Sequence, residues 1–306
     1  MSVYKEPFKW IKQSIYSIIQ QTFTDFEFII ICDNPSNQNL VDFLELFSKR
    51  DRRIKLIVNE NNLGLTRSLN KGLEYACGKY IARMDADDIS LPLRFQKQVE
   101  FLEQHPNVIV LGTSYSYIGK GASIRTSNTK CDDESIRAQM LLTNCIAHSS
   151  VFIRRSVLVN NNIVYDETYR QSQDYRLWEL LFPYGEFACL NEKLLNYRLS
   201  SQQITKTEGS KQSHLAMIVR TRLQHAWLSR CGYNFPLELI SDKPFKIIEI
   251  LRRDCNITCT KEYKAYLSYA YLYSEDQSWT ISYLIKYDLI KLSVFDTIRL
   301  LKRIIS

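Results

Sequence analysis

The feature that most constrains the fold of this 306-residue chain is an alternation of short apolar runs with amphipathic segments. The runs at 26–32 ("FEFIIIC"), 53–59 ("RIKLIVN") and 80–84 have the length and composition of strands buried on both faces, and 1–4 reads as the tail of another. Segments 6–21, 39–48 and 66–76 between them place apolar residues at helical spacing. This order predicts an α/β fold with a mostly parallel central sheet.

The pattern continues to about residue 200 and then changes. A helix is predicted at 95–103, a strand at 108–118, a polar loop at 119–133, a strand near 149–153 and a helix within 171–182. Beyond residue 200 strand patterns disappear, and the segments rich in Leu, Ile, Tyr, Lys and Arg read as helices. We therefore expect a domain at 1–203 and a helical C-terminal region at 204–306.

The net charge and the cysteines limit the kinds of binding partner and the cellular compartment that fit this chain. The net charge of +7 suits an anionic partner, but Lys and Arg are dispersed without a nucleic-acid-binding motif, so nucleic acid is not expected. The eight Cys form no C-x-x-C pair, which argues against structural zinc. Nothing at the N-terminus resembles a signal peptide, and no apolar stretch is long enough to span a bilayer. A cytoplasmic protein with reduced thiols is predicted.

An acidic cluster follows the strand at 80–84, in "YIARMDADDISLP". Asp85, Asp87 and Asp88 lie within four positions, and two carboxylates about 4 Å apart repel by ~4 kcal/mol at an effective dielectric constant near 20. A divalent cation removes that cost, and Mg²⁺ favours one or two carboxylates together with substrate phosphates. The alternative is a solvated acidic turn that caps the next helix.

With its flanks, this cluster resembles the family 2 glycosyltransferases of GT-A fold. The resemblance rests on "NNLGLTRSLNKGLEYACGKYIARMDADDISLPLRF", preceded by "QSIYSIIQQTFTDFEFIIICDN" and followed by "HSSVFIRR" and "QDYRLW". It covers roughly residues 1–200 in the expected order. It implies an inverting transfer of a hexose from a nucleotide sugar, UDP-linked in our reading, to a growing bacterial surface polysaccharide or a lipid-linked glycan.

The resemblance also implies roles for the donor-side residues. Asp85 and Asp87 match the D-x-D motif, in which the second carboxylate holds Mg²⁺ or Mn²⁺ on the diphosphate and the first faces the ribose. Asp33 matches the position that reads the base edge, and Tyr4 an aromatic residue that stacks near the base. An ordinary turn residue at Asp33 and a core aromatic at Tyr4 are the alternatives.

On the acceptor side, the resemblance assigns the general base to Asp174, and His148 and Trp178 to the acceptor region. Asp174 could also cap the helix that carries Trp178, and His148 could be a buried structural residue. Cys32 and Gln173 stand where the family often has a second acidic residue. Family members usually begin with a longer apolar first strand, so that strand is expected to be shortened here. A non-catalytic partner that keeps the fold and a metal-dependent nucleotidyltransferase remain alternative functions.

The last segment, "LIKYDLIKLSVFDTIRLLKRIIS", forms an apolar helical stripe flanked by Lys and Arg. Such a helix either lies on an anionic membrane, which would make the protein peripheral, or packs on the chain's own catalytic domain. Both remain open from the sequence.

Overall fold

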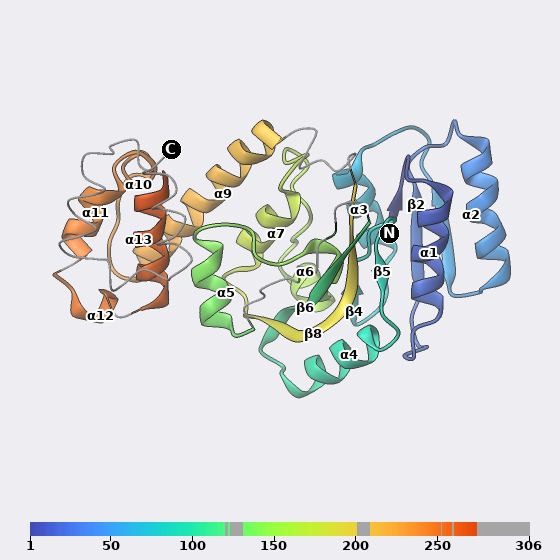
Figure 1. Ribbon diagram of the computed structural model, residues 1–306, viewed down its shortest axis with the longest axis horizontal. Helices are drawn as coiled ribbons and strands as arrows, with labels where there is room; N and C mark the ends of the chain where they lie inside the picture. The colour runs from blue at the N-terminus through green and yellow to red at the C-terminus, as the bar shows by residue number, and fades with distance from the viewer. Residues whose placement is uncertain (120–121, 123–130, 201–208, 252, 259, 274–306) are drawn as a thin grey trace. The chain divides into compact units, whose positions relative to one another are not determined.

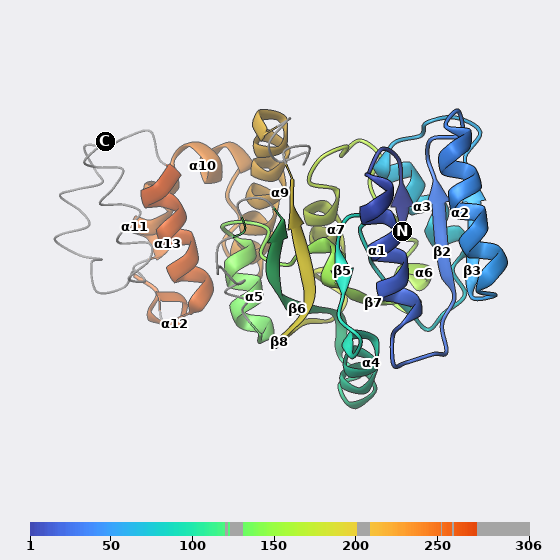
Figure 2. The same ribbon diagram turned by 45° about the vertical axis from the view of Figure 1, so that its right-hand side comes forward.

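The computed structural model describes residues 1–119, 122, 131–200, 209–251, 253–258 and 260–273 (Figures 1 and 2). The chain divides into two compact units. The first comprises Met1–Asp132 and Ile146–Leu215, and the second Asp133–Cys145 and Ala216–Ser306. Within the described ranges no helix is long and apolar enough to cross a bilayer.

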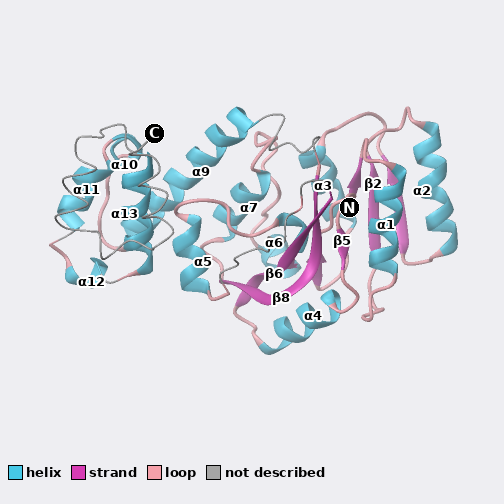
Figure 3. Ribbon diagram, viewed as in Figure 1, coloured by secondary structure: helices cyan, strands magenta, loops and turns pink. Residues whose placement is uncertain are grey.

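The first unit begins with a parallel three-stranded sheet in the order β1-β2-β3. Its strands are β1 (Ser2–Val3), β2 (Phe28–Cys32) and β3 (Ile54–Val58). The helices that follow β1, β2 and β3 are α1 (Phe8–Ile19), α2 (Gln38–Arg50) and α3 (Leu65–Tyr75). Figures 1 and 3 show this alternation of strand and helix, which confirms the predicted α/β class.

Local sequence explains where these helices begin. The α1 helix starts after Pro7, whose fixed φ suits a helix start, and it buries Ile11, Ile15 and Ile18. The Asn37 side chain accepts a 3.2 Å hydrogen bond from the Leu40 N–H and so caps α2. Gly64 precedes α3 with φ of +84°, a conformation that costs glycine little.

A second, mixed sheet completes the first unit in the order β4-β7-β6-β8-β5. Its strands are β4 (Tyr80–Ala82), β5 (Ile89–Ser90), β6 (Val108–Gly119), β7 (Phe152–Arg154) and β8 (Glu186–Leu199). Only β6 and β8 run parallel in it, and the other pairs are antiparallel. Further helical elements among the described residues of this unit are α4 (Arg94–Gln104), η1 (His148–Ser150), α6 (Arg155–Asn160) and α7 (Gln173–Leu181).

The long strand β8 was not predicted from the sequence. Its apolar pattern is broken by Asn191, Glu192 and Lys193. At this point the pairing with β6 shifts in register: Thr113 pairs with Leu190, but the next residue, Ser114, pairs with Lys193. The polar residues therefore sit at a bulge rather than at the end of a strand. This strand matters for the site, because its C-terminal end pairs with β5 directly after the acidic cluster.

The second unit is helical and takes its first helix from the middle of the chain. Its elements are α5 (Asp133–Met140), α10 (Leu237–Asp242), α11 (Pro244–Leu251), α12 (Cys255–Thr258) and α13 (Lys261–Tyr273), with α9 (Gly209–Arg230) entering it from the first unit. Lys261 on α13 contacts Glu134 on α5 at 3.0 Å. The predicted boundary between residues 203 and 204 lies in 201–208, outside the described residues, and stays a prediction.

Candidate active site

The acidic cluster lies in the loop between β4 and β5, and Asp88 anchors it. The Asp88 carboxylate is buried and accepts hydrogen bonds from the Ser149 hydroxyl at 2.5 Å and the Arg198 backbone N–H at 2.7 Å. These bonds fix the loop to η1 and to the end of β8. The helix α4 begins later and has no side-chain cap, so the alternative of a capping turn is wrong.

Asp85 and Asp87 differ in what balances their charge. Asp85 forms a 2.5 Å ion pair with Arg83, whose side chain is buried. Among the described residues, no side chain pairs with the Asp87 carboxylate. Burial first, and then the charges of Asp85 and Glu6, raise the pKa of Asp87 to about 7. Without a cation beside it, the Asp87 carboxyl is therefore only about half ionised near pH 7.

Glu6 is a carboxylate near this loop that sequence reasoning missed. Its Oε2 accepts a 2.8 Å hydrogen bond from the Tyr4 N–H, directly after β1. Burial raises the pKa of Glu6, and the charge of Asp85 acts in the same direction. Because parallel strands end at one edge of a sheet, an acidic residue just after β1 was a usable signal.

Arg198 is the second residue that the sequence did not reveal. Its Nε donates to the Asp87 backbone carbonyl at 2.6 Å, and another guanidinium nitrogen donates to Gln13 Oε1 at 2.9 Å. The guanidinium also lies 5.0 Å from the ring centroid of Trp10, within cation–π range. One side chain at the end of β8 therefore holds the acidic loop against α1.

On the predicted base-binding side, Asp33 follows β2 and is only 2% exposed. Its Oδ1 accepts hydrogen bonds from Asn59 Nδ2 at 2.7 Å and the Leu63 N–H at 2.8 Å, and its Oδ2 accepts one from the Gly64 N–H at 2.9 Å. Asp33 therefore holds the loop that leads into α3. Tyr4 lies next to it, because the Asn34 side chain donates to the Tyr4 carbonyl. Tyr4 is 36% exposed, and the Lys5 ammonium lies 4.6 Å from the centroid of its ring.

The predicted acceptor-side residues cluster around Tyr165. His148 Nε2 lies 2.8 Å from the Tyr165 hydroxyl, and its ring meets the Trp178 ring edge-on at 6.1 Å. Burial lowers the pKa of His148 well below its usual value, and the nearby Arg83 charge lowers it further. Trp178 is 0% exposed, so it packs against His148 and does not face solvent.

Asp174 lies in the first turn of α7, where its Oδ1 accepts a 2.8 Å hydrogen bond from the Tyr175 N–H. It follows Ser172, which has a left-handed φ of 58°. Burial raises the pKa of Tyr165; the Arg83 charge opposes this shift, whereas the charges of Asp174 and Asp85 add to it. The charges of Asp174 and Asp85 thus act on the same tyrosine.

The donor set of the acidic loop fits a hard divalent cation. Within the described part of the chain, no three His, Cys, Asp or Glu side chains are arranged to hold a metal ion by themselves. Mg²⁺ commonly uses one or two carboxylates and completes its shell with phosphate oxygens and water. Asp87, with which no described side chain pairs, and the neighbouring Asp85 would supply such a partial coordination shell.

Comparison with known proteins identifies the family. Residues 1–161 match Glycosyl transferase family 2. An uncharacterised glycosyltransferase of Haemophilus influenzae is 31% identical over 298 residues, which cover 94% of this chain and 89% of the relative. The chain therefore belongs to glycosyltransferase family 2, which confirms the resemblance inferred from the sequence.

Two further matches describe what relatives do. The O-antigen biosynthesis glycosyltransferase WbnJ of Escherichia coli is 30% identical over 238 residues, covering 76% of this chain and 92% of that protein. The structure of S. aureus TarS 1-349 in complex with UDP-GlcNAc has a TM-score of 0.58 at 15% identity, covering 78% of this chain and 74% of that one. This structural likeness confirms the GT-A fold.

Proposed function

We propose that this family 2 glycosyltransferase is an inverting, metal-dependent enzyme that transfers a hexose from a UDP-sugar. The acceptor is a hydroxyl of a growing surface polysaccharide or a lipid-linked glycan. The relative WbnJ acts in O-antigen biosynthesis, and the similar fold of TarS binds UDP-GlcNAc. The observation that carries the proposal is the carboxylate of Asp87: Asp85 is ion-paired with Arg83 and Asp88 is hydrogen-bonded to Ser149, whereas among the described residues no side chain pairs with Asp87.

On the donor side, Tyr4 stacks on the base, and the Asp33 loop forms the wall beside it. Because both Asp33 oxygens are already occupied by the protein, base recognition involves the loop that it holds as much as the carboxylate itself. Asp85 faces the ribose, and Asp87 faces the diphosphate. A bound Mg²⁺ or Mn²⁺ ion would supply Lewis-acid stabilisation of the charge that develops on the leaving diphosphate.

On the acceptor side, Asp174 accepts the proton of the attacking hydroxyl. The acceptor oxygen forms a bond to the anomeric carbon, while the bond between that carbon and the phosphate oxygen breaks and its electron pair leaves with UDP. One direct displacement inverts the anomeric configuration. Burial keeps His148 neutral, so it adds no second charge to the site. Its role is to orient the Tyr165 hydroxyl. Two alternatives, a non-catalytic assembly partner and a nucleotidyltransferase, have no observation in their favour.

Two substitutions test the roles separately, with Asp25→Asn as an exposed control. Asp87→Asn should abolish Mn²⁺-dependent hydrolysis and transfer of the donor, because it removes the charge that holds the cation. Asp174→Asn should leave Mn²⁺-dependent binding of UDP-sugar unchanged but slow transfer about 10²–10⁴-fold, as expected for loss of a general base.

The donors to assay are the nucleotide sugars that stabilise the protein in a thermal-shift screen. Turnover like that of Asp25→Asn in either variant would refute the assigned role.

The C-terminal stripe belongs to this proposal, although residues 274–306 lie outside the described part of the chain. We infer from its sequence that it makes a peripheral contact with an anionic membrane, where a lipid-linked acceptor would be met. This contact would place the enzyme on the cytoplasmic face of that membrane.

A further inference from the structure

Three tyrosines lie on one face of the ribbon formed by β6 and β8, at the end that pairs with the acidic loop. Tyr115 and Tyr117 belong to β6, and Tyr197 of β8 is the register partner of Tyr117. Residues two apart on a strand face the same side, and the ring centroids of the three residues lie 5.3, 5.4 and 5.9 Å from one another. At these distances aromatic rings are in contact, so the other two rings hold the ring of Tyr197.

Tyr197 stands between the two residues that attach β8 to the acidic loop. On one side of it, Asn196 pairs with β5. On the other, the Arg198 backbone N–H donates to the Asp88 carboxylate at 2.7 Å, and the Arg198 guanidinium donates to the Asp87 carbonyl at 2.6 Å. Because side chains alternate along a strand, β8 directs Tyr197 and Arg198 to opposite faces beside the same loop.

The hydroxyl of Tyr197 makes no hydrogen bond within the described part of the chain. By contrast, the hydroxyls of Tyr115 and Tyr117 lie 3.4 Å from each other. Burial, followed by the charges of the three aspartates in the acidic loop, raises the pKa of Tyr197. The hydroxyl therefore keeps its proton near neutral pH, which makes it a hydrogen-bond donor and not a base or an anionic metal ligand.

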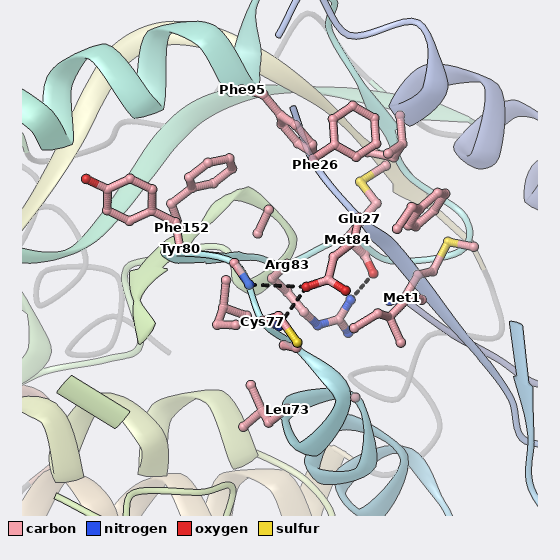
Figure 4. Close-up of a pocket in the computed structure, with 18 of the residues that line it drawn as sticks. Met1, Phe26, Glu27, Leu73, Cys77, Tyr80, Arg83, Met84, Phe95 and Phe152 are labelled. Atoms are coloured by element: carbon pink, nitrogen blue, oxygen red, sulfur yellow. Dashed lines mark hydrogen bonds between the residues drawn. The ribbon is translucent and has the colours of Figure 1, made fainter. Parts of the chain in front are cut away.

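The carboxylates of the loop are engaged or assigned elsewhere. Both oxygens of Asp88 accept hydrogen bonds from other groups. Asp85 is paired with Arg83, whose guanidinium group is shown in the close-up of Figure 4. Asp87 is the carboxylate that the proposed reaction assigns to the cation. An acceptor for the Tyr197 hydroxyl would therefore come from a ligand bound at the loop.

We propose that Tyr197 is a further catalytic residue, whose hydroxyl donates a hydrogen bond to the diphosphate oxygen that leaves the sugar. This inference rests on the proposed function, in which Asp87 faces the diphosphate. The bond between the anomeric carbon and that oxygen breaks, its electron pair stays on the oxygen, and Tyr197 keeps its proton throughout. Because the oxygen gains negative charge as the bond breaks, the hydrogen bond is stronger in the transition state than in the ground state, and this difference accelerates transfer.

Removal of the hydroxyl alone tests the role in the reaction. Tyr197→Phe keeps the ring in place between Tyr115 and Tyr117. Tyr117→Phe is the matched control, because it also removes one hydroxyl from this cluster. We expect Tyr197→Phe to lower kcat roughly 10–100-fold relative to the control, as for the loss of one donor to a developing anion. Equal kcat values for the two variants would overturn the proposal.

Binding of UDP and of UMP in the presence of Mn²⁺, measured by calorimetry, locates the contact. UMP lacks the phosphate that carries the leaving oxygen, so Tyr197→Phe should weaken UDP binding roughly tenfold and leave UMP binding unchanged. An equal loss for both nucleotides would indicate a structural effect and would also overturn the proposal. A raised KM for the UDP-sugar with unchanged UDP binding would place the hydroxyl on the sugar and refute the assigned oxygen.

The same measurements separate this inference from the function on which it rests. If only the role of Tyr197 is wrong, the wild type still binds UDP with Mn²⁺, and Asp87→Asn still abolishes transfer. A wild type that takes up no UDP would overturn the proposed function together with this inference.

Discussion

The hydrogen bonds of Asp33 give a prediction whose size can be worked out from the structure. Its carboxylate is buried and accepts three hydrogen bonds, from Asn59, Leu63 and Gly64. In Asp33→Asn one oxygen remains for the first two donors, and an NH₂ group replaces the oxygen that accepts from Gly64. A charge-assisted hydrogen bond is lost and the Gly64 N–H faces another donor, which together cost about 3 kcal/mol.

The amide cannot escape this cost by rotating. Lys71 Nζ donates to Asn59 Oδ1 at 2.9 Å, which keeps the Asn59 NH₂ group directed at Asp33. A rotated Asn side chain would therefore oppose two donors instead of one. For a unit of this size, about 3 kcal/mol corresponds to a melting temperature lowered by roughly 6–12 °C.

Thermal unfolding of ligand-free protein, followed by circular dichroism, measures the effect. Asp25→Asn is the matched control, because Asp25 is exposed and precedes the same strand. The reasoning would be refuted by an Asp33→Asn melting temperature within about 2 °C of the control. If donor affinity fell while stability stayed constant, Asp33 would act on the donor itself and not through the loop that it holds.

Two further predictions concern pH and the membrane. The folded-state pKa of His148 is depressed, so neutral His148 contributes stability that is present above its unfolded pKa of about 6.5 and lost as pH falls. His148→Gln should therefore lose less thermal stability than the wild type between pH 7 and 5, and equal losses would contradict the burial argument. In flotation with anionic liposomes, the full chain should rise with the vesicles and a version ending before Ile281 should not; identical behaviour would contradict the membrane contact.

Local patterns were sufficient for the elements that bury one continuous apolar run or stripe. The run at 26–32 became β2, and the helical stripe after Gly64 became α3, because each carries its own burial pattern and its own start or stop signal. Some helix boundaries differ from the expected ones. The helix expected at 6–21 occupies only Phe8–Ile19, because it begins after Pro7. The α/β order of the first unit was thus accessible from sequence.

What could not be predicted depends on contacts between distant segments. β5 has two residues and exists only because it pairs with Leu195 and Asn196 of β8, which itself is interrupted by a bulge. α5 joins the C-terminal helices, where Gln224 donates to the Leu141 carbonyl just after that helix. No local pattern in the sequence of α5 indicates which distant helices it will pack against.

The acidic loop also depends on distant contacts. Its motif predicted a cluster of carboxylates, but not which of them bind other parts of the chain. Asp88 is tied to Ser149 and the backbone of Arg198, and Asp85 to Arg83, so these two carboxylates hold the loop in place. Burial, and then the charges of Asp85 and Glu6, raise the pKa of Asp87 to about 7. A loop held by these contacts would need little rearrangement to bind the proposed cation and diphosphate. Preorganisation of this kind lowers the cost of binding. If the proposed donor site is correct, Arg198, which donates to the Asp87 carbonyl, belongs to it together with the motif.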